Sequence, residues 1–147
     1  MPYQFKFEKV LTIREQEKEE AILVYEKAIK AFEEEATKLF ELLRKKEELE
    51  EVQRTQLSSG TSVQIIRHHQ QFLGNLLKSI HHQQEVVMRA RTKMQYEEQR
   101  LIEKNIEVKK LEKMKEKDLS NFLNELDRLE SKWMDELSML QMANRGS

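Results

Sequence analysis

Four histidines, in the pairs His68/His69 and His81/His82, are the residues of this 147-residue chain best suited to bind a metal ion. Their spacing is wrong for that chemistry. Adjacent residues on a helix point about 100° apart, so neither pair can chelate one ion. His68 and His82 share a helix face but would lie about 21 Å apart along the axis. We therefore expect no metal site, and we interpret the histidines as solvated or hydrogen-bonded.

Other catalytic chemistry is also poorly supported. The sequence Gly60-Thr61-Ser62 lacks the earlier glycine and the lysine that a phosphate-binding loop uses. The chain has no cysteine, which excludes a thiol nucleophile, a disulfide and an iron–sulfur cluster. Carboxylates are plentiful, but long helices offer no cleft in which a pKa could be shifted for acid–base catalysis. The sequence thus predicts a protein that is not an enzyme and has no catalytic residue or cofactor.

The composition favours long helices. Charged residues make up 36% of the chain, and it contains only three glycines and one proline, too few for the turns of a sheet protein. The longest apolar run is five residues, Ala21 to Tyr25, whereas a membrane span needs about 18, so direct membrane insertion is not expected. The first residues do not resemble a signal peptide, which favours the cytoplasm. A net charge of −1 argues against bulk binding of nucleic acid.

A break between two helices is predicted around Gly60. Small polar residues beside a glycine are typical of a helix end, and Thr61 with Gln64 has the form of a capping box. The sequence predicts a single coiled-coil domain, 1–147, that consists of a helix over about 4–57, a turn at 58–61, a helix over about 62–141 and a frayed tail at 142–147.

Apolar residues recur every seven positions in both predicted helices, which is the pattern of a coiled coil. The column in the second helix contains Leu73, Ile80, Val87, Met94, Leu101, Val108, Lys115, Phe122 and Leu129. In the first helix one column contains Leu11, Lys18, Tyr25, Phe32, Leu39 and Lys46, with a second column at Ile22, Ile29, Ala36 and Leu43. Pairing Leu11 with Val108 and Leu39 with Ile80 centres both pairs between Ser59 and Gly60, at the predicted turn. The pattern predicts an all-α fold: a long antiparallel two-helix coiled-coil hairpin with an overhanging C-terminal helix arm.

The overhang leaves an apolar stripe without an intramolecular partner. It consists of Leu119, Phe122, Leu126, Leu129, Trp133, Leu137 and Leu140. Tyr3, Phe5 and Phe7 could cover only a small part of it. An uncovered stripe of this length predicts a binding surface.

Charge is distributed unevenly along the chain. Residues 1–57 hold 11 basic and 14 acidic side chains, residues 58–117 hold 12 and 7, and residues 118–147 hold 3 and 6. No acidic residue occurs from Val52 through Gln84. On a helical wheel in this segment Leu77 and Ile80 face the first helix, whereas Ile65, Phe72 and Leu76 flank the seam. This pattern predicts an apolar, acidic partner; the alternative is a coiled coil that is thicker near its turn.

Three segments resemble the FliJ family of the bacterial flagellar export apparatus. They are Tyr3 to Leu11 leading into Arg14-Glu15, Val63 to Leu73 with its Gln70-Gln71-Phe72 sequence, and the charged run Glu107 to Lys117. The resemblance implies a stalk-like coiled coil, similar to the central stalk subunit of rotary ATPases, without a nucleotide site of its own. It implies binding to and activation of the hexameric ring of the flagellar export ATPase FliI, a link to the export gate protein FlhA, and assistance to export chaperones and cargo. It also implies a location at the cytoplasmic face of the cell membrane, reached through these partners.

The resemblance further suggests which residues bind. In the family a patch early in the second helix contacts the gate, which corresponds here to Phe72 and Leu76, with Ile65 beside them. Candidates for the contact with the ATPase ring are Phe5, Phe7, Phe122, Leu126 and Trp133. We expect a monomer, with a homodimer possible. Two alternative functions are a structural coiled coil that homodimerises through the stripe, and a membrane or nucleic-acid adaptor that uses the weakly basic turn region.

Overall fold

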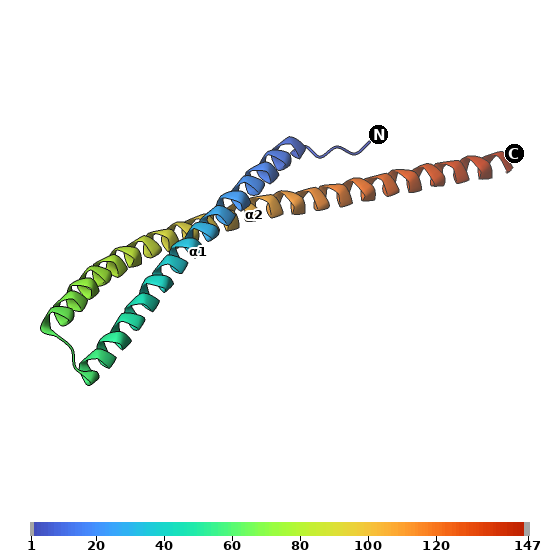
Figure 1. Cartoon of the computed structure of the whole chain (residues 1–147). Coiled ribbons are helices and arrows are strands. Elements are labelled where there is room, and N and C mark those ends of the chain that lie inside the picture. The colour runs from blue at the N-terminus through green and yellow to red at the C-terminus, as the bar shows by residue number, and fades with distance from the viewer. Residues whose placement is uncertain (1, 146–147) are drawn as a thin grey trace. The chain divides into compact units, whose positions relative to one another are not determined.

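The protein consists of two long helices that pack against each other as a helical hairpin (Figure 1). The computed structural model describes residues 2–145. Helix α1 spans Glu8–Ser59 and helix α2 spans Val63–Arg145, and all regular secondary structure in the described residues is helical. The predicted all-α hairpin is confirmed. Within residues 2–145, neither helix is long and apolar enough to cross a membrane.

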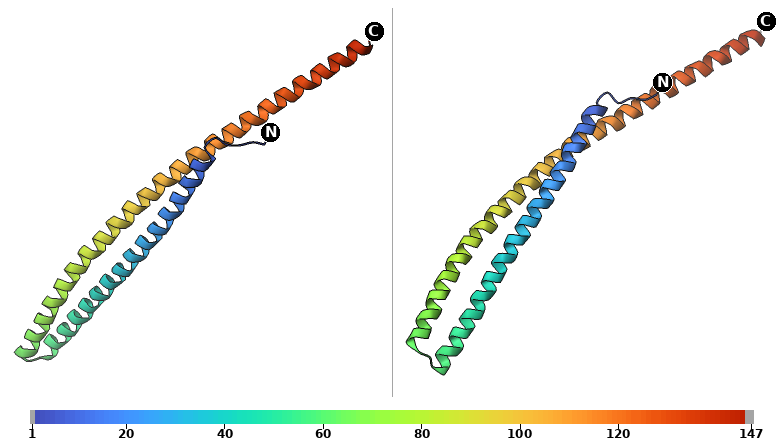
Figure 2. Two further views of the ribbon diagram at one scale, coloured as in Figure 1. Left: turned by 90° about the horizontal axis from the view of Figure 1, so that it is seen from above. Right: turned by 45° about the horizontal axis from the view of Figure 1, so that its top comes forward.

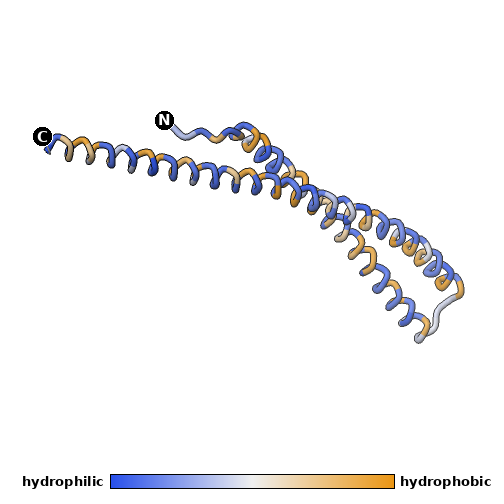
Figure 3. The backbone as a smooth tube through the Cα atoms, turned by 180° about the vertical axis from the view of Figure 1, so that it is seen from behind, coloured by the Kyte–Doolittle hydropathy of each residue, from blue (hydrophilic) through white to orange (hydrophobic). Residues whose placement is uncertain are grey.

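Both helices follow the predicted apolar repeat, with shifted ends. Figure 3 shows hydrophobic positions recurring between hydrophilic ones along each helix. Helix α1 begins at Glu8 rather than near residue 4, where Glu8 N–H donates to the Phe5 carbonyl at 3.2 Å and its carboxylate favours the positive end of the helix dipole. Helix α2 continues to Arg145, so the expected frayed tail is helical up to that residue, and residues 146–147 lie outside the described part of the chain.

The loop between the helices is shorter than predicted, and its cap is one residue later. Gly60 has φ +86°, the left-handed conformation that glycine tolerates best. The Ile65 backbone N–H donates to Ser62 Oγ at 3.3 Å, which makes Ser62 the N-cap of α2. The predicted capping box of Thr61 and Gln64 is therefore wrong, because the residue three positions after the true cap is Ile65, whose side chain has no atom that could accept a hydrogen bond from the Ser62 backbone N–H.

Contacts between residues group the chain into two compact units. Unit 2, Glu20–Ile102, contains the loop and the helix segments on either side of it. These two segments run side by side and antiparallel (Figure 2). Ala28, Leu76 and Ile80 are buried between these segments. Gln83 Nε2 donates to the Glu35 carbonyl at 2.9 Å, within one residue of the predicted register.

Unit 1 contains the chain up to Glu19 and from Glu103 onward. Leu11 and Val108, predicted to face each other, are its most deeply buried residues. Three ion pairs join α1 to α2 here: Glu8–Lys115 at 2.9 Å, Glu17–Lys104 at 3.2 Å and Arg14–Glu107 at 3.7 Å. The predicted antiparallel register therefore holds in this unit to within a helical turn.

Candidate partner-binding surfaces

The histidines do not form a metal centre in the part of the chain that the structure describes. Residues 2–145 contain no group of three or more His, Cys, Asp or Glu side chains that could hold an ion. The rings of His68 and His69 lie edge to face, 6.4 Å apart. His81 Nε2 lies 3.4 Å from Glu85 Oε1 on an exposed face of α2. The candidates for function are the surfaces of the helices on which large apolar side chains are exposed.

The first surface lies early in α2, in unit 2. Phe72 is 53% exposed and Ile65 is also exposed, as predicted for residues beside the seam. Leu76 differs: it is only 8% exposed, because it lies in the seam. The expectation that Leu76 belongs to an exposed patch is wrong, and so is the expectation that Leu77, which is exposed, faces α1.

The difference depends on which second column of α2 joins the Leu73 column in the seam. Three residues after the members of the Leu73 column from Leu73 to Val108 stand Leu76, Gln83, Ala90, Glu97, Lys104 and Leu111. Four residues after the same members stand Leu77, Gln84, Arg91, Glu98, Asn105 and Glu112. Both columns start with leucine, but in the first column Gln83 and Lys104 find partners on α1. Burying the second column would desolvate three charged side chains, Arg91, Glu98 and Glu112, whereas the first column buries one, Glu97, and half-buries Lys104.

The hydrogen bonds that this column donates also stabilise the ionised form of their partners on α1. Lys104 Nζ donates to Glu17 Oε2 at 3.2 Å, and this bond lowers the pKa of the Glu17 carboxyl against the opposing effect of desolvation. Gln83 Nε2 donates to Glu35 Oε2 at 2.6 Å and lowers the pKa of that carboxyl in the same way. Both acids therefore favour the ionised form in the folded protein.

The N-terminal segment folds onto α2 in unit 1. The Tyr3 hydroxyl donates to Asp118 Oδ2 at 3.0 Å, and its ring lies 5.4 Å from the ring of Phe122. Burial raises the pKa of Tyr3, and the hydrogen bond to Asp118 adds to this effect. Phe5 is 7% exposed, so its expected availability to a partner is wrong; it packs edge to face with Phe7, 5.8 Å away. The contact of Tyr3 with Asp118 had no short-range signal in the sequence, because the two residues are far apart along the chain.

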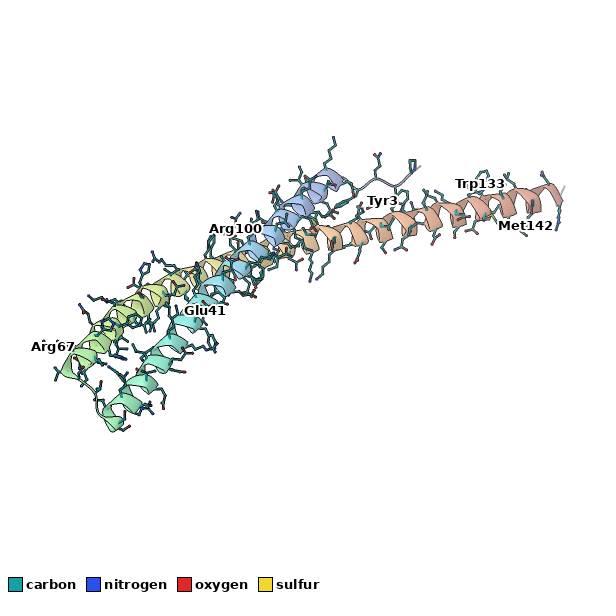
Figure 4. All side chains as sticks on the ribbon, viewed as in Figure 1. Tyr3, Glu41, Arg67, Arg100, Trp133 and Met142 are labelled. Atoms are coloured by element: carbon teal, nitrogen blue, oxygen red, sulfur yellow. The ribbon has the colours of Figure 1, made fainter. Side chains whose placement is uncertain are left out.

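The second surface is the apolar stripe near the end of α2. Beyond the contact of Tyr3 with Phe122, every residue from 123 to 145 is exposed, and nothing in the described chain covers this segment. Trp133 is 59% exposed, and Leu126, Leu129, Leu137 and Leu140 are exposed on the same face. Figure 4 shows Trp133 and Met142 leaving α2 on different sides. Of the predicted ring-contact residues, Leu126 and Trp133 are thus accessible. Phe7 is 36% exposed, and Phe122 is half-buried under Tyr3.

Comparisons with known proteins bear on the whole chain. The family model described as "Flagellar FliJ protein" matches residues 3–147. The flagellar FliJ protein of Bacillus subtilis (strain 168) is 44% identical over 146 residues, which are 99% of this chain and 99% of that protein.

The chain belongs to the FliJ family. The predicted resemblance is confirmed, and the match extends from Tyr3 through the stripe. The family assignment identifies the chain as a non-enzymatic component of flagellar protein export.

A solved structure shares the fold. It is that of the putative YscO homolog CT670 from Chlamydia trachomatis, with a TM-score of 0.69 and 23% sequence identity, covering 99% of this chain and 100% of that one. At this identity the similarity concerns the fold alone. The two-helix hairpin described here is therefore an architecture found in an experimental structure.

Proposed function

We propose that this FliJ-family chain acts as a stalk-like coiled coil that binds and activates the flagellar export ATPase ring. The observation that carries the proposal is the stripe of α2, which is apolar, fully helical and uncovered. Burial of apolar surface contributes about 25 cal/mol per Å² to binding, so an accessible row of leucines and a tryptophan favours association with a partner. The energy of export would come from nucleotide bound by the ATPase, and this chain would bias its subunits by contacting them differently.

The proposal includes a link from the ATPase to the export gate protein FlhA. Phe72 and Ile65 are two of the exposed apolar residues in a segment without acidic side chains, which favours an apolar and acidic partner surface. Leu76 supports this patch from within the seam rather than touching the partner. Through the gate protein the chain would reach the cytoplasmic face of the membrane without entering it, and it would assist export chaperones and their cargo there.

Titration of the ATPase tests the stalk role. The cognate flagellar export ATPase is assayed under ring-forming conditions with the full chain and with a chain that ends after Leu123. This truncation removes Leu126 to Leu140 but keeps Asp118 and Phe122, the partners of Tyr3. We expect stimulation by the full chain that saturates near one chain per six ATPase subunits, and little by the truncated chain.

Controls separate this role from a structural one. Circular dichroism must show that the truncated chain keeps its paired helices. If neither protein changes the ATPase rate while rings form, the stalk role is refuted, and a structural coiled coil becomes the better interpretation.

Binding to the gate protein is tested separately. Phe72→Ala is expected to weaken binding to the purified cytoplasmic domain of FlhA, whereas Leu77→Ala is not, because residues 72 and 77 point about 140° apart on the helix. Both side chains are exposed, so neither change removes a seam contact. Equal weakening by the two variants would contradict the assignment of this face.

A further inference from the structure

The apolar positions of α2 continue beyond the part that pairs with α1. In unit 1 the buried and half-buried seam residues Val108, Lys115 and Phe122 recur every seven residues. In the stripe Leu119, Leu126, Trp133 and Leu140 recur at the same spacing. A seven-residue repeat keeps one face of a helix apolar over several turns, so the stripe presents a face on which a partner can pack.

The stripe is also rotated away from the seam. In the paired part the second apolar column follows the first by three residues, as in Val108 and Leu111. In the stripe it follows by four, as in Phe122 and Leu126. The position three residues after Phe122 is Glu125, whose carboxylate pairs with Arg128 at 2.6 Å. The stripe therefore shares the Phe122 column with the seam, but its second column lies on the other side of that column.

Acidic side chains border the stripe on both sides. With Trp133 at the centre of the helical wheel, Glu130 lies at about +60° and Glu136 at about −60°. The basic residues of this segment, Arg128, Lys132 and Arg145, lie at about 100° or more from the centre. Glu130 and Glu136 thus form an acidic rim around an apolar strip.

From these observations we infer that the stripe binds an apolar groove of the ATPase ring whose edges carry lysine or arginine. The inference rests on the proposed function and specifies the chemistry of its partner surface. Charge complementarity at the edges would set the register of the contact, while the apolar centre would supply most of the affinity.

The same rim disfavours a second copy of this chain as the occupant. In an antiparallel pair centred on Trp133, Glu130 of the two chains would lie along one edge of the seam and Glu136 of the two chains along the other, and a parallel pair would place Glu130 and Glu136 along the same edge. Like charges placed beside an apolar seam are destabilising. A partner whose groove edges carry lysine or arginine would attract these acidic side chains, whereas pairing with a second copy of the chain would bring two sets of them together.

Charge reversal tests the inference. The rim variant Glu130→Lys with Glu136→Lys is compared with the control variant Asp127→Lys with Asp135→Lys. Both variants change the net charge by the same amount, but residues 127 and 135 lie on the far side of α2, about 120° and 160° from Trp133. Glutamate and lysine have similar helix propensities, and circular dichroism confirms that each variant stays helical.

In an ATPase titration we expect the rim variant to need at least tenfold more protein for half-maximal stimulation, and the control variant less than threefold more. Raising the salt concentration should weaken the wild-type protein more than the rim variant. If the wild-type chain stimulates and the rim variant matches it, the inference is overturned and the proposed function stands. Absence of stimulation by the wild-type chain overturns both. Dimerisation of the wild-type chain through the stripe at neutral pH, measured by sedimentation velocity, would also overturn the inference.

Discussion

At the scale of single residues, Leu76 and Phe72 illustrate how little separates a structural side chain from an accessible one. They are one helical turn apart on α2, yet Leu76 is buried in the seam and Phe72 is exposed. Their substitution should therefore affect different properties of the protein.

Leu76→Ala is expected to lower the free energy of unfolding by about 2 kcal/mol, the low end of the range for removing a buried leucine, because a two-helix seam lets water reach the gap. Phe72→Ala should change it by no more than about 0.5 kcal/mol, as is usual at the surface. Urea denaturation of both variants measures this difference. Similar losses from the two substitutions would contradict the rotation of α2 described here.

The two carboxylates bound across the helices predict acid sensitivity. The pKa values of Glu17 and Glu35 are lowered from the ordinary value of 4.5 by hydrogen bonds from Lys104 and Gln83. Because the folded pKa is below the unfolded one, this stabilisation is complete above about pH 4.5 and is lost as the pH falls through the folded values.

The midpoint of thermal unfolding should accordingly fall on acidification below pH 4.5, and it should fall less in a Glu17→Gln, Glu35→Gln variant. A pH series followed by circular dichroism provides the measurement. An identical acid response in the variant would show that other carboxylates dominate.

At the scale of elements, the loop between α1 and α2 depends on one backbone conformation. Gly60 has φ +86° and Gly74 lies within α2, and at both positions an added Cβ would meet no atom within 4 Å. Both sites therefore have room for a methyl group, and only their backbone conformations differ in how well they suit alanine.

Gly60→Ala should destabilise the protein by about 1–2 kcal/mol, the cost of a left-handed conformation for an L-residue. Gly74→Ala should stabilise it by about 0.5–1 kcal/mol, because alanine is the better helix former. Thermal denaturation of both variants checks the opposite signs. A stabilising effect at Gly60 would mean that the loop adopts another conformation in solution.

At the scale of the whole molecule, the helical part of the chain is longer than the part in which the two helices pack against each other. Helix α2 is continuous to Arg145, but every residue from 123 to 145 is exposed. An unsupported helix of this length is only marginally stable in water, and its hydrogen bonds open without unfolding the rest.

Amide hydrogen exchange should therefore be fast in residues 123–145 and slowest around Leu11 and Val108. Mass spectrometry of peptic fragments, at several protein concentrations, would measure the difference. Equal protection of the two regions at the lowest concentration would contradict the exposed state of the stripe. Protection that grows with concentration would identify self-association as its cause.

The order of residues along the chain was enough to predict the fold class, the antiparallel register, the position of the loop at Gly60 and the unpaired stripe. These features follow from the seven-residue repeat and from the small polar residues at its centre. The folded chain was needed to show that Leu76 rather than Leu77 enters the seam, that Ser62 rather than Thr61 caps α2, and that Tyr3 and Phe5 pack in unit 1. The physical reason is that leucines at neighbouring positions fit the repeat equally well. Contacts with distant partners, such as Glu35, Glu17 and Asp118, then choose between them.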